Sequence, residues 1–209
     1  MILDNRLFFP ATERNRKCIG DLLSTLPLSR GSILEIGSGS GEHGVVFQKL
    51  FPEITWQSSD PELIHRNSIS SWIDYEGLNL KMPQPLDINV EKNPWIIPSV
   101  IKQSLQAIIS INMIHVASWN CAKSLFRESG QLLKNGQFLI LYGPFKIDNQ
   151  HISQSNNLFD KSLKIQNKLW GVRNLHEVSE EASRNNFIQE DLILMPANNF
   201  SIIYKQVSH

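Results

Sequence analysis

The feature that most constrains this 209-residue chain is a run of alternating glycines, Gly37-Ser38-Gly39-Ser40-Gly41. Residues 32–36, just before it, are mostly apolar and are typical of a short buried strand. Residues 43–50, just after it, carry apolar side chains at helical spacing. Glycine tolerates positive φ and lets a ligand lie directly on the backbone, and a helix start offers unpaired N–H groups. The run therefore predicts a strand–loop–helix unit that can bind an anionic or polar ligand.

Patterns of strand and helix alternate along the rest of the chain. We expect helices over 13–26 and within 61–76, strands over 32–36, 54–58, 107–113 and 138–142, a helix beginning near Asn174, and a closing hairpin of 191–195 and 201–204. This alternation predicts an α/β fold with a doubly wound, mostly parallel sheet, to which the hairpin adds an antiparallel strand. No repeat or flexible linker interrupts the chain. We therefore predict one domain over 1–209, with a helical cap at 1–30.

The polar segment 145–173 fits this pattern least well. It is rich in asparagine and lies between the end of a predicted strand and the next helix. Two interpretations remain open: a lid with its own helix near 158–165, or a surface excursion.

Composition narrows the possible partners. Lys plus Arg total 20 and Asp plus Glu total 20, whereas a dedicated nucleic-acid binder usually has a basic excess, so nucleic acid is disfavoured. No apolar run approaches the ~20 residues of a membrane span, and the first ten residues do not resemble a signal peptide. The two cysteines are far apart and the histidines have no metal-site spacing, so we expect a cytoplasmic protein without a disulfide framework or a bound metal.

An acidic residue follows the next predicted strand. Asp60 comes 19 residues after Gly41, at the position where an acid in doubly wound folds accepts the ribose hydroxyls of an adenosine-containing cofactor. Asp60-Pro61 is also a good turn pair, which is the simpler explanation. Together with the glycine run, the ligand-binding interpretation is favoured.

The identity of the cofactor depends on Glu35. Residues 39–44 also fit the dinucleotide pattern G-x-G-x-x-G, so a nicotinamide or flavin oxidoreductase has to be considered. Dinucleotide folds usually have apolar residues where this chain has Glu35, and the closing hairpin leaves no second nucleotide-binding half. Glu35 could instead hold the ammonium group of a methionine moiety, directly or through water.

At this point a family resemblance is apparent. The segment 35–41 resembles the first motif of class I S-adenosylmethionine-dependent methyltransferases, and the terminal hairpin resembles theirs. More narrowly, the chain resembles an uncharacterised methyltransferase-like family found in bacteria and animals, through 9–15, 111–115, 141–145 and 195–199. The resemblance implies a Rossmann-like class I methyltransferase fold with seven strands, and S-adenosyl-L-methionine as cofactor. It does not supply a substrate.

The resemblance also implies roles for particular residues. The cofactor-binding set is Arg14, Glu35, Gly37, Gly39, Gly41, Asp60, Asp87, Ile88, Asn112 and Met113. In this set Asp87 meets the adenine amino group and Ile88 packs on the adenine ring. Arg14 pairs with the methionine carboxylate, for which an Arg fork is suited. The competing explanations are a surface turn at Asp87 and a solvated helix start at Arg14.

The catalytic candidates follow the predicted strands 107–113 and 138–142. Asn112 and Met113 end the first of these strands, at the edge where open α/β sheets bind ligands. His115 could deprotonate a nucleophile, or it could be bonded to the backbone and shape the loop. Tyr142 could orient the substrate or bond the cofactor, or it could serve packing alone.

The sequence therefore predicts an S-adenosylmethionine-dependent methyltransferase that acts on a small molecule or a protein side chain. A non-catalytic S-adenosylmethionine-binding or scaffold protein with the same fold is the alternative, and a nicotinamide oxidoreductase is a third possibility. The oligomeric state is left open.

Overall fold

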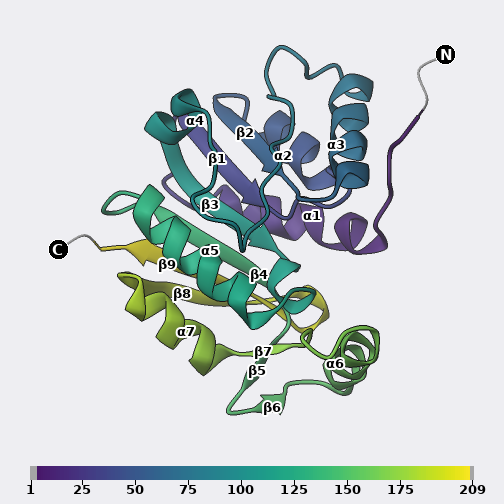
Figure 1. Cartoon of the computed structure of the whole chain (residues 1–209), viewed down its shortest axis with the longest axis vertical. Helices are drawn as coiled ribbons and strands as arrows, with labels where there is room; N and C mark the ends of the chain where they lie inside the picture. The colour runs from purple at the N-terminus through teal and green to yellow at the C-terminus, as the bar shows by residue number, and fades with distance from the viewer. Residues whose placement is uncertain (1–3, 208–209) are drawn as a thin grey trace. The chain divides into compact units, whose positions relative to one another are not determined.

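The structure, a computed structural model, describes residues 4–207 (Figure 1). These residues form two compact units, the first ending at Ile109 and the second beginning at Ser110. Residues 1–3 and 208–209 of the predicted domain lie outside the described part. A single domain over 1–209 stays a prediction.

The first unit is built on parallel strands. Strand β1 (Gly31–Ile36) pairs in parallel with β2 (Ile54–Ser59), from Gly31 opposite Ile54 to Ile36 opposite Ser59. It also pairs in parallel with β3 (Leu105–Ile111). All but the first residue of β1 are buried, as expected for strands that are covered on both faces.

Four helices accompany these strands: α1 (Pro10–Leu23), α2 (Glu42–Leu50), α3 (Leu63–Tyr75) and α4 (Ser99–Ser104). Helix α2 packs against α1, α3 and β2. Its Phe47 ring lies 5.0 Å from the ring of Trp56 on β2, and both side chains are fully buried. Helix α1 begins three residues before the predicted 13–26, because Pro10 presets φ for a first helical position.

The second unit contains the closing hairpin. Strand β9 (Asn199–Gln206) runs antiparallel to both β4 (Phe138–Gly143) and β8 (Phe187–Met195). Helix α7 (Leu175–Arg184) begins where predicted, with the Asn174 side chain accepting a hydrogen bond from the His176 N–H. Helix α5 (Trp119–Leu132) escapes sequence-based prediction because serines interrupt the apolar residues on its buried face.

The segment 145–173 has regular structure of its own. It contains α6 (Gln154–Gln166) and the short strands β5 (Phe145–Ile147) and β6 (Gln150–His151), and β5 also pairs with β7 (Arg173–Asn174). Helix α6 extends the predicted 158–165 by a turn at its start. Its role as a lid stays a prediction.

The central sheet has six strands in the order β2-β1-β3-β4-β9-β8, and the fold is α/β with a mostly parallel sheet, as predicted. In place of a seventh strand there is an isolated parallel bridge between Ser59 and Leu86. The Leu86 N–H donates to Ser58 O at 3.0 Å, and Leu86 O accepts from the Asp60 N–H at 3.1 Å. The segment around Leu86 is thus held at the end of β2 without forming a strand.

Burial predicts which leucines stabilise the second unit. Leu139 on β4 is 0% exposed, whereas Leu194 on β8 is 68% exposed. Leu139→Ala leaves a cavity and is expected to lower the free energy of unfolding by about 2–5 kcal/mol. Leu194→Ala, the matched control, should change it by less than about 0.5 kcal/mol. Urea unfolding followed by circular dichroism measures both, and equal effects would contradict the described core.

Candidate functional site

The glycine loop joins the end of β1 to the start of α2 in the first unit. Gly39 and Gly41 have φ of 56° and 91°, values that favour glycine. The N–H groups of Gly37 and Ser38 donate to Ser59 O at 3.1 and 2.9 Å, so the loop is fastened to the end of β2. A Cβ on Gly41 would come within 2.8 Å of Ile69 Cα on α3, so the close approach of α3 also requires glycine there.

Asp60 lies against the glycine loop, as predicted for a binding site formed by these two features. The Asp60 Oδ2 accepts a hydrogen bond from the Gly39 N–H at 3.0 Å. Its Oδ1 accepts from the Glu62 N–H and lies 3.0 Å from His65 Nδ1. The side chain is buried. A carboxylate is therefore fixed against a backbone turn that has no side chain at Gly39.

An aromatic pair lies over this turn, and neither member is predicted from the sequence. A Cβ on Gly39 would lie 2.9 Å from the ring of Phe9, and the rings of Phe9 and His65 meet edge to face at 5.8 Å. Phe9 belongs to the matched stretch 9–15, which is a signal that could have indicated it. His65 has no comparable signal.

The segment that carries Phe9 is attached to helices α2 and α3. The Phe9 N–H donates to the Glu42 carboxylate at 3.0 Å, and the Leu7 N–H donates to Ser68 Oγ at 2.8 Å. In return, the Trp72 indole N–H donates to Leu7 O at 3.1 Å. Both the N–H and the carbonyl oxygen of Leu7 are thus hydrogen-bonded to side chains of α3.

Glu35 is buried beside β2. Its carboxylate accepts from the Trp56 indole N–H at 3.0 Å and from Ser58 Oγ at 3.4 Å. Burial raises the pKa of Glu35 to about 7, against the opposing effect of these hydrogen bonds. All of these described partners belong to the protein core. The predicted contact of Glu35 with an ammonium group stays a prediction.

The three remaining candidates of the first unit are less closely grouped. Asp87 is exposed and pairs with Arg66 at 3.0 Å, and Arg66 also donates to Asp60 O at 2.9 Å, which links the two acidic residues. Ile88 is buried. Arg14 is exposed on α1 and has no ion pair within residues 4–207.

In the second unit, Asn112 and Tyr142 lie side by side at strand ends. Asn112 has φ 60°, and its N–H donates to Tyr142 O at 2.8 Å. Tyr142 is buried, and its hydroxyl accepts from Asn199 Nδ2 at 3.2 Å. Met113 follows and begins a short 3₁₀ turn, Met113–His115.

His115 is fully buried in the second unit. Its ring meets Phe145 edge to face at 5.1 Å and occupies the place of a side chain on Gly143. Neither ring nitrogen forms a hydrogen bond within the described part of the chain. Burial, helped by the charge of Arg173, lowers the pKa of His115 to about 3, so the ring is neutral at physiological pH. A base has to contact its proton donor, and this burial favours a role in shaping the loop.

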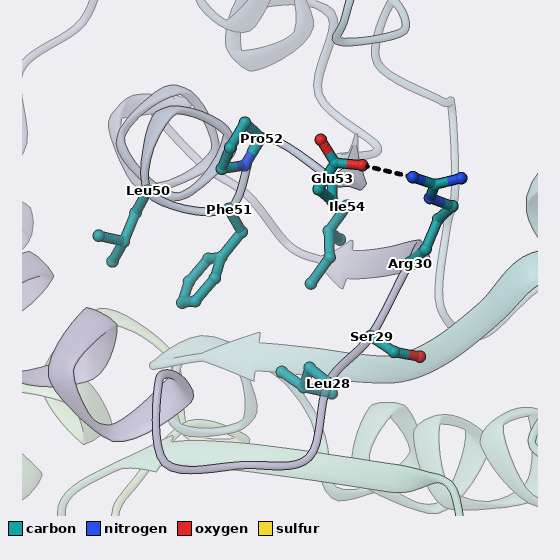
Figure 2. Close-up of a pocket in the computed structure, with 8 residues that line it drawn as sticks. All are labelled: Leu28, Ser29, Arg30, Leu50, Phe51, Pro52, Glu53 and Ile54. Carbon is teal, nitrogen blue, oxygen red and sulfur yellow. Dashed lines mark hydrogen bonds and ion pairs between the residues drawn. The ribbon is translucent and has the colours of Figure 1, made fainter.

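A cavity of about 400 Å³ lies elsewhere in the first unit (Figure 2). It is lined by residues 28–30 and 50–54, at the amino ends of β1 and β2, and the Arg30–Glu53 ion pair of 3.0 Å lies on its border. The glycine loop follows the carboxyl end of β1, so the cavity is not the predicted cofactor site. Within residues 4–207, no group of three or more His, Cys, Asp and Glu side chains could hold a metal ion.

The family described as Protein of unknown function (DUF938) matches residues 6–206, nearly the whole chain. The chain belongs to this family. The match includes the glycine loop, Asp60 and all four stretches on which the resemblance rests. The family description names neither activity nor ligand. Membership in DUF938 therefore does not indicate the function, which has to be inferred from the candidate site.

Several of the solved structures similar to this DUF938 protein are named as methyltransferases. An O-methyltransferase family protein from Burkholderia thailandensis matches with a TM-score of 0.76 and 13% identity, over 95% of this chain and 58% of that one. Human N-acetylserotonin methyltransferase, solved with S-adenosylmethionine, matches with a TM-score of 0.74 and 12% identity, over 95% and 53%. An O-methyltransferase family 2 protein from Planctomyces limnophilus, solved with apigenin, matches with a TM-score of 0.71 and 14% identity, over 93% and 62%.

These similarities confirm the predicted methyltransferase fold. The DUF938 chain spans little more than half the length of the solved structures that it matches. Within residues 4–207, no helix combines the length and the apolar character that a membrane crossing requires.

The raised pKa of Glu35 predicts a pH dependence of stability. Because the folded pKa is about 7 and the ordinary value is 4.5, the folded state holds the proton more tightly. This contribution to stability is complete below pH 4.5 and is lost as pH rises through 7. Glu35→Gln removes this pH-dependent loss of stability, because Gln does not titrate. The Gln side-chain oxygen can still accept the hydrogen bond from the Trp56 indole N–H. Relative to the wild type, the free energy of unfolding of the variant should rise by about 3 kcal/mol between pH 4.5 and pH 7.

Chemical unfolding of both proteins across this pH range measures the difference. Comparing the variant with the wild type cancels the opposite contributions of His43 and His115, whose pKa values burial lowers to about 3. Parallel stability curves for the two proteins would contradict the raised pKa.

Proposed function

We propose that this protein is an S-adenosylmethionine-dependent methyltransferase. The observation that carries the proposal is the hydrogen bond between Asp60 and the Gly39 N–H, which fixes a buried carboxylate on the glycine loop. A carboxylate at this strand end is suited to the ribose hydroxyls of an adenosine-containing cofactor. The methyltransferase structures that share the fold support this cofactor over a dinucleotide.

Different residues of the first unit are suited to different parts of such a cofactor. Gly37, Gly39 and Gly41 give the turn a bare backbone, and the first turn of α2 presents N–H groups to polar ligand atoms. A Cβ on Gly39 would lie 2.9 Å from the Phe9 ring, so the close approach of that ring also requires glycine at this position. In our proposal Asp87 and Ile88 receive the adenine, Arg14 pairs with the methionine carboxylate, and Glu35 supports the ammonium side.

When bound, S-adenosylmethionine supplies an activated methyl group for in-line displacement, so the protein mainly has to orient the reactants. Asn112, held in the left-handed region, and the adjacent Met113 are our candidates for contacts beside the methyl group. Tyr142 is our candidate for orienting the substrate. His115 is buried and neutral, so we assign it a positioning role through the Met113–His115 turn.

For the substrate, a small molecule methylated on oxygen is favoured, because several of the similar structures are named as O-methyltransferases. A protein side chain is the second substrate class. We propose the cytoplasm as the compartment, on the sequence features given above.

A non-catalytic S-adenosylmethionine-binding protein is the competing function. The burial of His115 favours it, because a fully covered imidazole cannot accept a proton from a substrate. Methyl transfer that depends on Asn112 would exclude this function. Transfer from radiolabelled S-adenosylmethionine to a panel of phenolic and carboxylic small molecules, compared between wild type and Asn112→Ala, makes the distinction.

Calorimetric titration with S-adenosylmethionine tests the binding site. Asp60→Ala should abolish binding, because ribose hydroxyls lose their acceptor. Since Asp60 also accepts from the Gly39 N–H, Asp60→Asn is the companion variant: it keeps an acceptor and removes the charge. We expect it to weaken binding about tenfold or more, equivalent to about 1.4 kcal/mol.

Asp74→Ala, on the exposed face of α3, is the matched control and should bind like the wild type. Circular dichroism of each variant verifies folding. Unchanged affinity in a folded Asp60→Ala protein would overturn the site. Saturable binding of NAD, with none of S-adenosylmethionine or S-adenosylhomocysteine, would instead support the oxidoreductase.

A further inference from the structure

Helix α6 presents an apolar stripe to solvent on the face opposite its buried one. Asp160 and Leu163 point inward and are buried. Leu158 and Ile165, two helical turns apart, are 59% and 86% exposed. Leu169, in the turn that follows the helix, is 63% exposed. The outward face of this helix therefore carries apolar side chains, whereas its buried face carries Asn156 and Asp160 beside Leu163.

Positive charge accompanies the stripe. Lys161 and Lys168 are exposed, and neither forms an ion pair within residues 4–207. The acid of this helix, Asp160, is turned inward: it accepts from Lys164 at 2.7 Å and lies 3.3 Å from Lys146. Hydrogen bonds from Lys164 and from the Val172 N–H hold its pKa at about 2 even though burial opposes this. Asp160, the acidic residue of α6, therefore pairs with Lys164 and Lys146 and with neither Lys161 nor Lys168.

The same bias is visible in the sequence. Segment 145–173 contains five of the 20 Lys and Arg residues but two of the 20 Asp and Glu residues, in a chain with no net charge. One of those two acids is the buried Asp160. The segment thus has a basic excess of three residues.

We propose that this face of α6 is a docking surface for an acidic, amphipathic helical segment of another protein. The α6 stripe consists of Leu158, Lys161 and Ile165 on the helix, together with Lys168 and Leu169 in the turn that follows it. Apolar side chains at helical spacing are the anchors that helix-mediated recognition uses, and an exposed apolar patch marks an interaction site. The flanking lysines select a partner with carboxylates beside its own apolar row, because opposite charges favour encounter and fix register.

Two other occupants fit the stripe less well. A second copy of this chain offers the exposed Glu177 and Glu180 of α7, but the apolar Val178 and Ala182 of that helix are buried. An anionic membrane gains only about 1 kcal/mol for each lysine near its surface, and the stripe has two lysines without an ion pair. A foreign acidic helix supplies both the charge and the apolar row.

Fluorescence anisotropy of the full-length protein tests the proposal. The probe is a fluorescein-labelled, end-capped helical peptide of repeated Glu-Leu-Leu-Glu units, and its counterpart with Lys in place of Glu is the charge control. We expect saturable binding of the acidic peptide that weakens with added salt, and no binding of the basic one. The assay contains no S-adenosylmethionine, so its outcome is independent of the proposed methyl transfer.

Surface variants locate the binding. Ile165→Ser and the double variant Lys161→Glu/Lys168→Glu should each weaken binding by about tenfold or more. Leu194→Ser, at an exposed leucine of β8, and Lys123→Glu, at an exposed lysine of α5, are the matched controls and should leave it unchanged.

Several results would overturn the proposal. The first is no binding of the acidic peptide, and the second is binding that the stripe variants do not weaken. The third is self-association, measured by sedimentation, that is lost in Ile165→Ser. The fourth is binding to phosphatidylserine vesicles in the absence of any peptide binding. Because the altered residues are exposed, circular dichroism should show all variants folded, which keeps each result interpretable.

Discussion

The described first unit depends on the junction between the carboxyl ends of β1 and β2. Two loop N–H groups donate to Ser59 O, and the Gly39 N–H donates to the Asp60 carboxylate. These bonds satisfy backbone donors that the tight turn would otherwise leave unpaired, which matters in a buried place. They also fix the direction in which α2 leaves the sheet. One set of hydrogen bonds therefore stabilises the turn and shapes the surface on which a cofactor would lie.

Burial shifts the pKa of one titratable side chain in each unit, in opposite directions. Glu35 is surrounded by donors from β2, yet burial is strong enough to raise its pKa to about 7. His115 has no such donors within residues 4–207, and its pKa falls to about 3. Both shifts have the same cause, because low polarity disfavours whichever form is charged. His115 is therefore neutral in neutral solution, whereas Glu35, with a pKa of about 7, changes its charge close to that pH.

The sequence predicts the α/β class, the glycine loop, Asp60 and the closing hairpin, because each depends on local patterns. Periodicity finds α2 and α3, and glycine spacing finds the turn. Helix α5 is missed because polar side chains occupy part of its inward face, and Phe9 and His65 are missed because their importance comes from tertiary contacts. The same limit applies to His115: its distance from solvent depends on Gly143 and Phe145, which no local pattern connects to it.

The attachment of Leu7 to α3 has a practical consequence. The indole N–H of Trp72 is bonded to Leu7 O, and this tryptophan is largely buried beside the segment that carries Phe9 over Gly39. Indole emission responds to hydrogen bonding and to water contact, so Trp72 is a built-in optical reporter of whether the amino-terminal segment is seated. The chain has five tryptophans, and replacing the other four with phenylalanine would isolate that signal. Stopped-flow spectroscopy could then follow the opening of this segment without any added dye.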